Sequence, residues 1–304
     1  MKFLTFSVQE QTRLGMLLDD NRVLDLTALL AARPELGLPG APRNVGDLIA
    51  LGDAALARLR EPGLLDGVDI GALPTLDAVR VQPPLAMARN VFCVGRNYRE
   101  HIIEGNLARG RPANSFPEAI EFFTKAPTAV IGHGGHVKRH AGLTDSLDYE
   151  VELAIVIGRA GADIPREKAL DHVFGYTIVN DITARDLQAR HGQWFKGKSL
   201  DTSCPMGPVV VHRSAIPDAN RLAVSLSVNG ELRQQDNTSD MIFDVATVIA
   251  QLSAGMTLLP GDVIATGTPK GVGFALTPPR CLQVGDVVSA SVEHIGTLTN
   301  EIVA

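Results

Sequence analysis

Three acidic residues carry the strongest chemical signal in the sequence. Glu150 and Glu152 lie two apart in DYEVELAIVIG, so on a strand they share one face. Two neighbouring carboxylates repel each other unless something positive lies between them. The alternative interpretation is a strand edge that faces the solvent. Asp181 follows the apolar run in IVNDITARD, where it could also cap a helix. Three carboxylates without a nearby cysteine suit a hard divalent cation, so we expect a catalytic Mg²⁺ or Mn²⁺ site.

The stretch HGQWFKGKS matches the phosphate-binding pattern G-x-x-x-x-G-K-[ST]. A P-loop needs a strand before it, small residues within it and a helix after it. Here ITARDLQARHG has a helical pattern, the loop contains Trp194 and Phe195, and the prolines of LDTSCPMGP exclude a long helix. We therefore reject a nucleotide-binding loop and expect a different role for Lys198.

Histidines suggest one general base and one weaker metal site. His101 and Glu104 are three apart on an expected helix, so they can meet, and a carboxylate-oriented histidine is a usual general base. A solvated helix with a chance pair is the alternative. His133, His136 and His140 in IGHGGHVKRH could bind zinc, but no strand or helix organises them, which favours a glycine-rich surface loop.

Composition excludes several classes of function. The 304-residue chain has a net charge of −6 and a pI near 5.8, which argues against a nucleic-acid partner. No apolar run is long enough for a membrane span, and MKFLTFSVQEQTR is a poor signal peptide. Cys93, Cys204 and Cys281 are widely spaced, which predicts core positions in a reducing compartment, so we expect a cytoplasmic protein.

The pattern of apolar residues predicts an α+β fold that is mostly β. Residues 1–80 predict a small N-terminal domain, with KFLTFSV and RLGMLLDDNRVLDLT as strands around a turn. The helix of NVGDLIALGDAALARLREPG follows, with Gly63 as its expected stop. Residues 85–304 predict the main domain, because short runs rich in Val and Ile alternate with Gly and Pro. Its main helices are expected in ITARDLQARH and MIFDVATVIAQLSAG.

Several motifs together resemble the fumarylacetoacetate hydrolase family from about Val91 to the C-terminus. They are GRNYREH, FTKAPTAVIG, YEVELAIVIG, GYTIVNDITARDLQ, WFKGKSLDTSCPMGP and LLPGDVIATGTPKGVG. Residues 1–80 resemble the smaller N-terminal domain of many bacterial members. The resemblance implies a mixed β-sandwich roll.

The resemblance also implies roles for individual residues. Glu150, Glu152 and Asp181 would hold the metal, and Lys198 would contact a substrate oxygen beside it. His101 and Glu104 would act as the base, on a segment that closes over the site. The residues implied on the substrate side are Arg96, Tyr98, Arg185, Gln188 and Thr268.

These roles predict a metal-dependent hydrolase that cleaves a C–C bond of a β-diketo acid, of the acylpyruvate or fumarylpyruvate type. The products would be pyruvate or a related oxo acid, and a carboxylic acid. The alternative is a decarboxylase, isomerase or hydratase that uses the same enolate chemistry. A non-catalytic binding protein on the same fold is a further alternative. We expect a small-molecule oxo-acid substrate, a homodimer, and neither nucleic acid nor membrane as partner.

Overall fold

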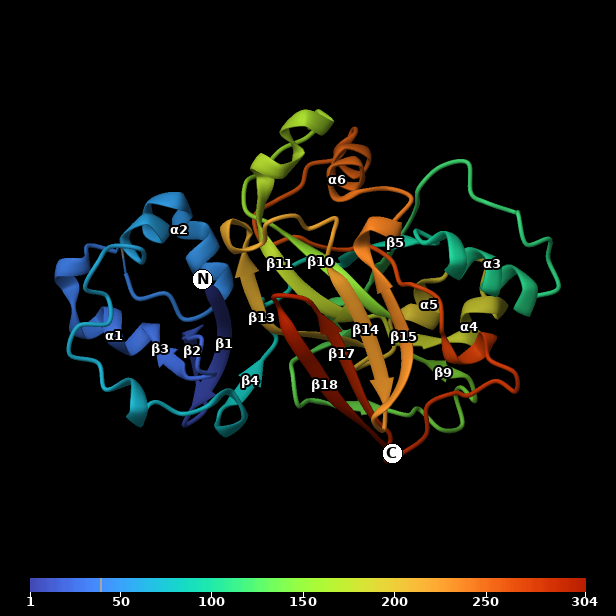
Figure 1. Cartoon of the computed structure of the whole chain (residues 1–304), viewed down its shortest axis with the longest axis horizontal. Helices are drawn as coiled ribbons and strands as arrows, with labels where there is room; N and C mark the ends of the chain where they lie inside the picture. Colours follow the sequence, from blue (N-terminus) through green and yellow to red (C-terminus); the bar gives the residue numbers. More distant parts are fainter. Residues whose placement is uncertain (39) are drawn as a thin grey trace.

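A long mixed sheet connects the N-terminal part of the chain to its centre (Figure 1). The computed structural model describes residues 1–38 and 40–304. The strand order is β3 (Val23–Asp25), β2 (Gln11–Leu17), β1 (Lys2–Val8), β13 (Cys204–His212), β11 (Val173–Asn180), β10 (Val151–Ile157), β16 (Val263–Ala265), β5 (Val91–Gly95) and β6 (Glu121–Lys125). Two short strands join this sheet, β4 (Arg80–Gln82) beside β1 and β7 (Val130–Ile131) beside β13.

A second sheet packs against the centre of the first. Its order is β15 (Glu231–Asn237), β14 (Ala223–Val228), β17 (Val287–Val292), β18 (Gly296–Val303) and β8 (His136–Lys138). Contacts of β14 with β10, of β17 with β11 and of β18 with β13 place the two sheets face to face. Apolar side chains from both facing surfaces form the main core, as in other β-sandwiches. The predicted fold class, with more strand than helix, is confirmed.

Strand β10 is buried on both faces, which explains its continuous apolar sequence. Leu153 and Ile155 belong to the main core between the sheets. Ala154 and Val156 point to the other face, into a second core that includes Leu48 of the N-terminal part. A strand covered on both sides needs apolar residues at every position, so the polar residues near its start are conspicuous.

The N-terminal part contains the predicted hairpin of β1 and β2, followed by β3, α1 (Leu26–Ala32) and α2 (Val45–Arg58). Helix α2 ends at Arg58, so the expected stop at Gly63 was placed too late. Strand β1 also pairs with β13, through Lys2↔Val211 and Phe3↔Val210. This pairing joins the N-terminal part to the main sheet, and a separate domain over residues 1–80 stays a prediction.

Helices α3 (Arg99–Ala108), α4 (Arg185–Arg190) and α5 (Phe195–Lys198) lie at the other end of the molecule from α1 and α2 (Figure 1). The helix expected in ITARDLQARH starts only at Arg185, because β12 (Thr183–Ala184) pairs with β9 (Leu147–Asp148). The other expected helix is α6 (Val245–Ser253). None of the helices in the two described ranges combines the length and apolar character that a membrane span requires.

Candidate active site

Three buried carboxylates meet where β10 and β11 pair. Glu150 precedes β10, Glu152 lies within it, and Asp181 follows β11. The Asp181 N–H donates to the Glu150 carbonyl at 2.8 Å, which holds the end of β11 beside the start of β10. One oxygen from each side chain lies within 4.8 Å of the others, and the residues are 4%, 1% and 0% exposed. The predicted grouping is therefore confirmed, and the solvent-facing strand edge is wrong. Helix capping by Asp181 is also wrong, because Ala184 occupies the N-cap position of α4.

Buried cations already pair with two of these carboxylates. Lys198 Nζ donates to Glu150 Oε2 at 2.8 Å and to Asp181 Oδ2 at 2.6 Å. Arg185 Nη1 lies 2.7 Å from Glu150 Oε1. Lys125 Nζ donates to Asp181 Oδ1 at 2.7 Å. The site therefore neutralises most of its own negative charge before any ligand binds.

These ion pairs determine the protonation of the paired groups. Burial alone would raise the pKa of Glu150, but the charges of Lys198 and Arg185 outweigh it and hold that pKa well below its ordinary value. Burial alone would lower the pKa of Lys198, but Asp181 and Glu150 outweigh it and raise that pKa. Glu150 is therefore a carboxylate and Lys198 an ammonium group at neutral pH.

Glu152 is the carboxylate that lacks a cation. Its Oε2 accepts a 2.8 Å hydrogen bond from the Gly267 N–H. Within the described part of the chain, no Lys or Arg nitrogen lies within 4.0 Å of it. Burial, together with the charges of Asp181 and Glu150, raises the pKa of Glu152 well above its ordinary value. A buried carboxylate in this position requires either a proton or a positive ion.

A divalent cation fits this donor set. Glu150, Glu152 and Asp181 provide only oxygen ligands, which Mg²⁺ and Mn²⁺ prefer, and their oxygens are already close together. A cation here would also provide the charge that Glu152 lacks. The residues present therefore fit the expected metal.

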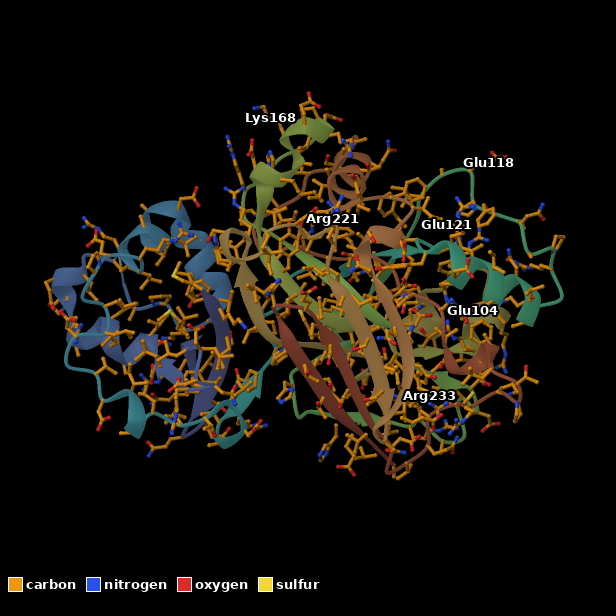
Figure 2. The ribbon with its side chains drawn as sticks, viewed as in Figure 1. Glu104, Glu118, Glu121, Lys168, Arg221 and Arg233 are labelled. Carbon is orange, nitrogen blue, oxygen red and sulfur yellow. The ribbon has the colours of Figure 1, made fainter. Side chains whose placement is uncertain are left out.

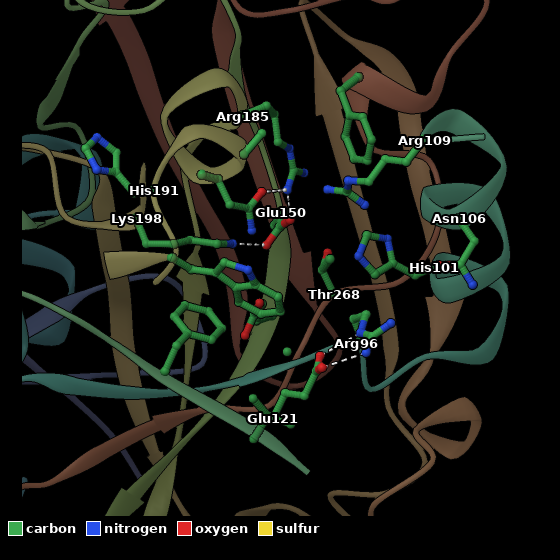
Figure 3. Close-up of a pocket in the computed structure, with 18 of the residues that line it drawn as sticks. Arg96, His101, Asn106, Arg109, Glu121, Glu150, Arg185, His191, Lys198 and Thr268 are labelled. Carbon is green, nitrogen blue, oxygen red and sulfur yellow. Dashed lines mark hydrogen bonds and ion pairs between the residues drawn. The ribbon is translucent and has the colours of Figure 1, made fainter. Parts of the chain in front are cut away.

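A cavity of about 420 Å³ opens beside Glu150 and Glu152 (Figure 3). The other predicted site residues that line it are Arg96, His101, Arg185, Gln188, Lys198 and Thr268. Thr268 Oγ1 accepts a 2.8 Å hydrogen bond from Gln234, and Arg96 forms a bidentate pair with Glu121. Phe123 also lines the cavity, which thus brings together residues from six separate sequence motifs.

The remaining predicted residues lie behind the cavity wall. Asp181 is 0% exposed and contacts the site through its carboxylate. Glu104 does not line the cavity and contacts His101. Tyr98 is 1% exposed and packs in the main core, so the structure does not place it among the residues that line the cavity.

The predicted contact between His101 and Glu104 is confirmed. Both lie on α3, where Figure 2 labels Glu104 and Figure 3 labels His101. His101 Nδ1 is 3.0 Å from Glu104 Oε1. The Gly271 N–H donates to both Glu104 oxygens, at 3.1 and 2.9 Å, which fixes the carboxylate. Gly271 has a φ of +100°, and a Cβ there would lie 2.0 Å from the Arg233 carbonyl oxygen, so only glycine fits. The TGTPKG loop therefore orients the histidine through Glu104.

Asp148 and Lys125 are site residues that sequence reasoning missed. Asp148 is 0% exposed and accepts hydrogen bonds from Arg185 Nε at 2.9 Å and from the Gly273 N–H at 2.8 Å. It lies two residues before Glu150, so the same strand periodicity could have identified it. Lys125 is also 0% exposed and donates to the Lys198 and Ile182 carbonyls as well as to Asp181. Lys125, the third residue of FTKAP, gave no comparable signal in the sequence.

The segment that mimics a P-loop forms an aromatic wall of the cavity. Helix α4 precedes it, α5 (Phe195–Lys198) lies within it and β13 follows it, so the strand–loop–helix order of a P-loop is missing from this described segment. Trp194 lines the cavity, and its ring packs edge-on against Phe123, with centroids 5.4 Å apart. A Cβ at Gly95 would lie 2.4 Å from Trp194 Cζ3, so Gly95 makes room for the ring. The rejection of a nucleotide-binding loop is confirmed.

The rival zinc site does not assemble. In the described ranges, Glu150, Glu152 and Asp181 form the only group of three potential ligands with suitably close atoms. His133 Nδ1 instead accepts from the Thr299 N–H at 3.1 Å, and His140 Nε2 lies 2.9 Å from the Asp201 carbonyl oxygen. Cys93 and Cys204 are buried in the core as expected, whereas Cys281 is partly exposed.

Comparison with known proteins finds relatives along the whole chain. Residues 90–303 match the model of the fumarylacetoacetate (FAA) hydrolase C-terminal domain. The chain is 47% identical to the oxaloacetate tautomerase YisK of Bacillus subtilis, over 99% of this chain and 100% of that protein.

Solved structures agree with this match. A fumarylacetoacetate hydrolase from Exiguobacterium antarcticum superimposes with a TM-score of 0.81 at 43% identity, covering 100% of this chain and 99% of that one. A maleylpyruvate hydrolase from a Sphingobium species superimposes with a TM-score of 0.75 at 30% identity, with the same coverage. Since the family model covers most of the chain and the relatives align from end to end, this protein belongs to the fumarylacetoacetate hydrolase family.

Proposed function

We propose that this protein is a divalent-metal-dependent enzyme that catalyses the enol–keto tautomerisation of a 2-oxo acid such as oxaloacetate. The observation that carries the proposal is that one small cavity places a carboxylate triad in need of a cation beside a proton-transferring histidine. The relative named as an oxaloacetate tautomerase, 47% identical along the whole chain, supports this reaction over others of the family.

The carboxylates would hold the metal. Glu150, Glu152 and Asp181 are its ligands in this proposal, and Mg²⁺ or Mn²⁺ would supply positive charge that favours the enolate form of the substrate. A divalent ion would add two positive charges to a site where Lys198, Arg185 and Lys125 already pair with Glu150 and Asp181. An anionic substrate is then attracted to a cavity that carboxylates alone would repel.

Lys198 and His101 would act on the substrate directly. Lys198 is an ammonium group held by Glu150 and Asp181, so it can offset negative charge on the enolate oxygen. His101 is oriented by Glu104 through Nδ1, which leaves Nε2 to exchange protons at the cavity. In tautomerisation the enol O–H bond breaks and a C–H bond forms at C3, while the C=C bond becomes C–C and the C–O bond becomes C=O. No water or second product is involved.

Hydrolysis of an acylpyruvate is the second candidate. The same histidine could deprotonate a water molecule, which would attack the distal carbonyl of a β-diketo acid, and the C–C bond would break to leave an enolate. The structural match to a maleylpyruvate hydrolase supports this reaction. The sequence favoured hydrolysis, whereas the comparisons give more support to the alternative of a decarboxylase, isomerase or hydratase, and within it to isomerisation.

A paired substrate assay separates the two reactions. The enol form of oxaloacetate is followed by its ultraviolet absorbance, and acylpyruvate cleavage by NMR detection of pyruvate and the carboxylic acid. We expect a large acceleration of enol loss with oxaloacetate and little acylpyruvate cleavage. Efficient acylpyruvate cleavage with no acceleration of the tautomerisation would show that the protein is a hydrolase and not a tautomerase.

A further inference from the structure

Two arginines that line the cavity have no acidic partner among the described residues. Arg109 and Arg111 both line the cavity, and within the described part of the chain no carboxylate lies within 4.0 Å of either guanidinium group. The other cavity arginines are paired, Arg96 with Glu121 and Arg185 with Glu150. The unpaired positive charge of the cavity is therefore concentrated on the segment that follows α3.

Arg109 is held close to the reaction site by an aromatic ring. Its Cζ lies 4.7 Å from the centroid of Phe274, and the Cζ of Arg185 lies 4.5 Å from the same centroid. Figure 3 shows the Arg109 and Arg185 side chains directed toward the same region of the cavity, above His101. Arg185 is 8% exposed, and its Nη2 is buried without a hydrogen-bond partner among the described residues. Two guanidinium groups that converge in this way match a carboxylate ligand.

The segment that carries Arg109 and Arg111 is built around a buried asparagine. Asn106 is 3% exposed, and its carbonyl accepts hydrogen bonds from the N–H groups of Arg109 at 3.1 Å and Arg111 at 2.8 Å. Its side-chain amide donates to the carbonyls of Ala113 and Ser115, at 3.3 and 3.0 Å. The two arginines are thus presented by an organised turn rather than by a loop without internal contacts.

The electrostatic environment of Arg109 favours the binding of an anion. Burial, together with the charge of Arg185, lowers the pKa of Arg109 from its ordinary value. An anion between the two guanidinium groups would relieve this repulsion. The 2-oxo acid group of the substrate belongs beside the triad, so an anion at Arg109 would be a different group of the same molecule.

We infer that Arg109, together with Arg185 against Phe274, binds the second carboxylate of the substrate, so that the site prefers 2-oxo dicarboxylates to 2-oxo monocarboxylates. The inference rests on the proposed function for the identity of the 2-oxo acid group. It adds a residue that determines specificity and lies outside the metal site and the histidine pair.

Calorimetric binding to two four-carbon acids tests the inference. Equilibrated oxaloacetate and 2-oxobutanoate, which lacks the second carboxylate, are titrated into the Mg²⁺-loaded protein. The wild type should bind oxaloacetate more tightly, and Arg109→Gln should reduce the ratio of the two affinities roughly 10- to 100-fold, the usual effect of removing one charged hydrogen-bonding partner. Arg109→Lys keeps the positive charge but lacks the planar guanidinium group, so it should retain part of the preference for oxaloacetate.

Arg99→Gln is the matched control. Arg99 begins α3, the helix that Arg109 follows, and its Cζ lies 4.9 Å from the centroid of the Phe116 ring, but it does not line the cavity. This variant should keep the wild-type affinity ratio within twofold, and thermal unfolding should show that all variants fold. A wild type without preference for oxaloacetate, or an Arg109→Gln variant with an unchanged ratio, overturns the inference. Because binding is measured at equilibrium, the ratio decides the role of Arg109 even if tautomerisation is not accelerated, so the two proposals can fail separately.

Discussion

The ammonium group of Lys125 lies 2.7 Å from Oδ1 of Asp181, and both side chains are completely buried. Lys125 also donates to the Ile182 and Lys198 carbonyls, so one side chain connects β6, the turn after β11 and the end of α5. Asp181 and Lys198, the proposed metal ligand and the proposed substrate-facing lysine, are therefore positioned by a third residue that does not line the cavity.

Lys125→Met should destabilise the protein strongly. Removal of one partner leaves Asp181 buried with less compensating charge, which typically costs about 3–5 kcal/mol. Urea unfolding of the metal-free protein measures this free energy. Lys168→Met is the control, because Lys168 is exposed at the top of Figure 2, far from the site. Equal stability of the two variants would show that the buried pair contributes little.

His101→Gln should reduce kcat for tautomerisation by roughly 10²–10⁴-fold, as expected for a positioned general base. Metal affinity should be nearly unchanged, because His101 is not among the triad ligands. His136→Gln, which replaces an exposed histidine on β8, should behave like the wild type. If His101→Gln instead loses the metal, this histidine is a ligand and the assigned role is wrong.

Gly95→Ala should displace the chain's one tryptophan. The added Cβ would lie 2.4 Å from Trp194 Cζ3, so the ring must move away from the cavity wall. We expect a shifted tryptophan emission spectrum and weaker substrate binding. Gly192→Ala is a close control in the same cavity, because its Cβ would meet nothing within 4 Å. Identical emission spectra for wild type and Gly95→Ala would contradict the packing described here.

The stability of the protein should fall as the pH is lowered from about 6.5 to about 4, in part because of His212. Burial, followed by the charge of Arg60, lowers the pKa of His212 from 6.5 to about 4. Its Nδ1 accepts from the Ser214 N–H at 3.1 Å and lies 3.1 Å from Arg60 Nη2, contacts that favour the neutral ring. Between these two pKa values the unfolded chain binds more protons than the native state, so acid favours unfolding.

His212→Gln should remove this contribution. We expect the wild type to lose roughly 1–3 kcal/mol more than the variant between pH 7 and pH 4, as judged by unfolding in denaturant at several pH values. Parallel stability curves for the two proteins would exclude His212 as the group responsible.

The sequence predicted the parts of the site that depend on local periodicity. Glu150 and Glu152 share a face because strand residues alternate, and His101 and Glu104 meet because helical residues three apart are neighbours. Lys125 could not be found in this way, because its partner lies 56 positions away and contact across that separation depends on the order of strands. The pairing of β1 with β13 likewise has no local signature.

Some local signals were misread because a neighbouring element changed their meaning. Asp181 has the right type for a helix cap, but Thr183 and Ala184 pair with β9 and delay the helix to Arg185. Tyr98 lies in a motif with site residues on either side of it, yet it is buried in the core while Arg96 and His101 reach the cavity.

Chemistry on a 2-oxo acid should require a divalent ion held by Glu150, Glu152 and Asp181. The direct measurement is the initial rate of enol-to-keto conversion of oxaloacetate by the wild type, before chelation, after complete metal removal, and after Mg²⁺ or Mn²⁺ is restored. Glu152→Gln serves as the site variant and Glu301→Gln as the exposed control. We expect the metal-free enzyme to be no faster than the uncatalysed reaction, restored metal to recover the rate, and Glu152→Gln to require far more metal than Glu301→Gln. A full rate in a verified metal-free preparation would show that no metal is required.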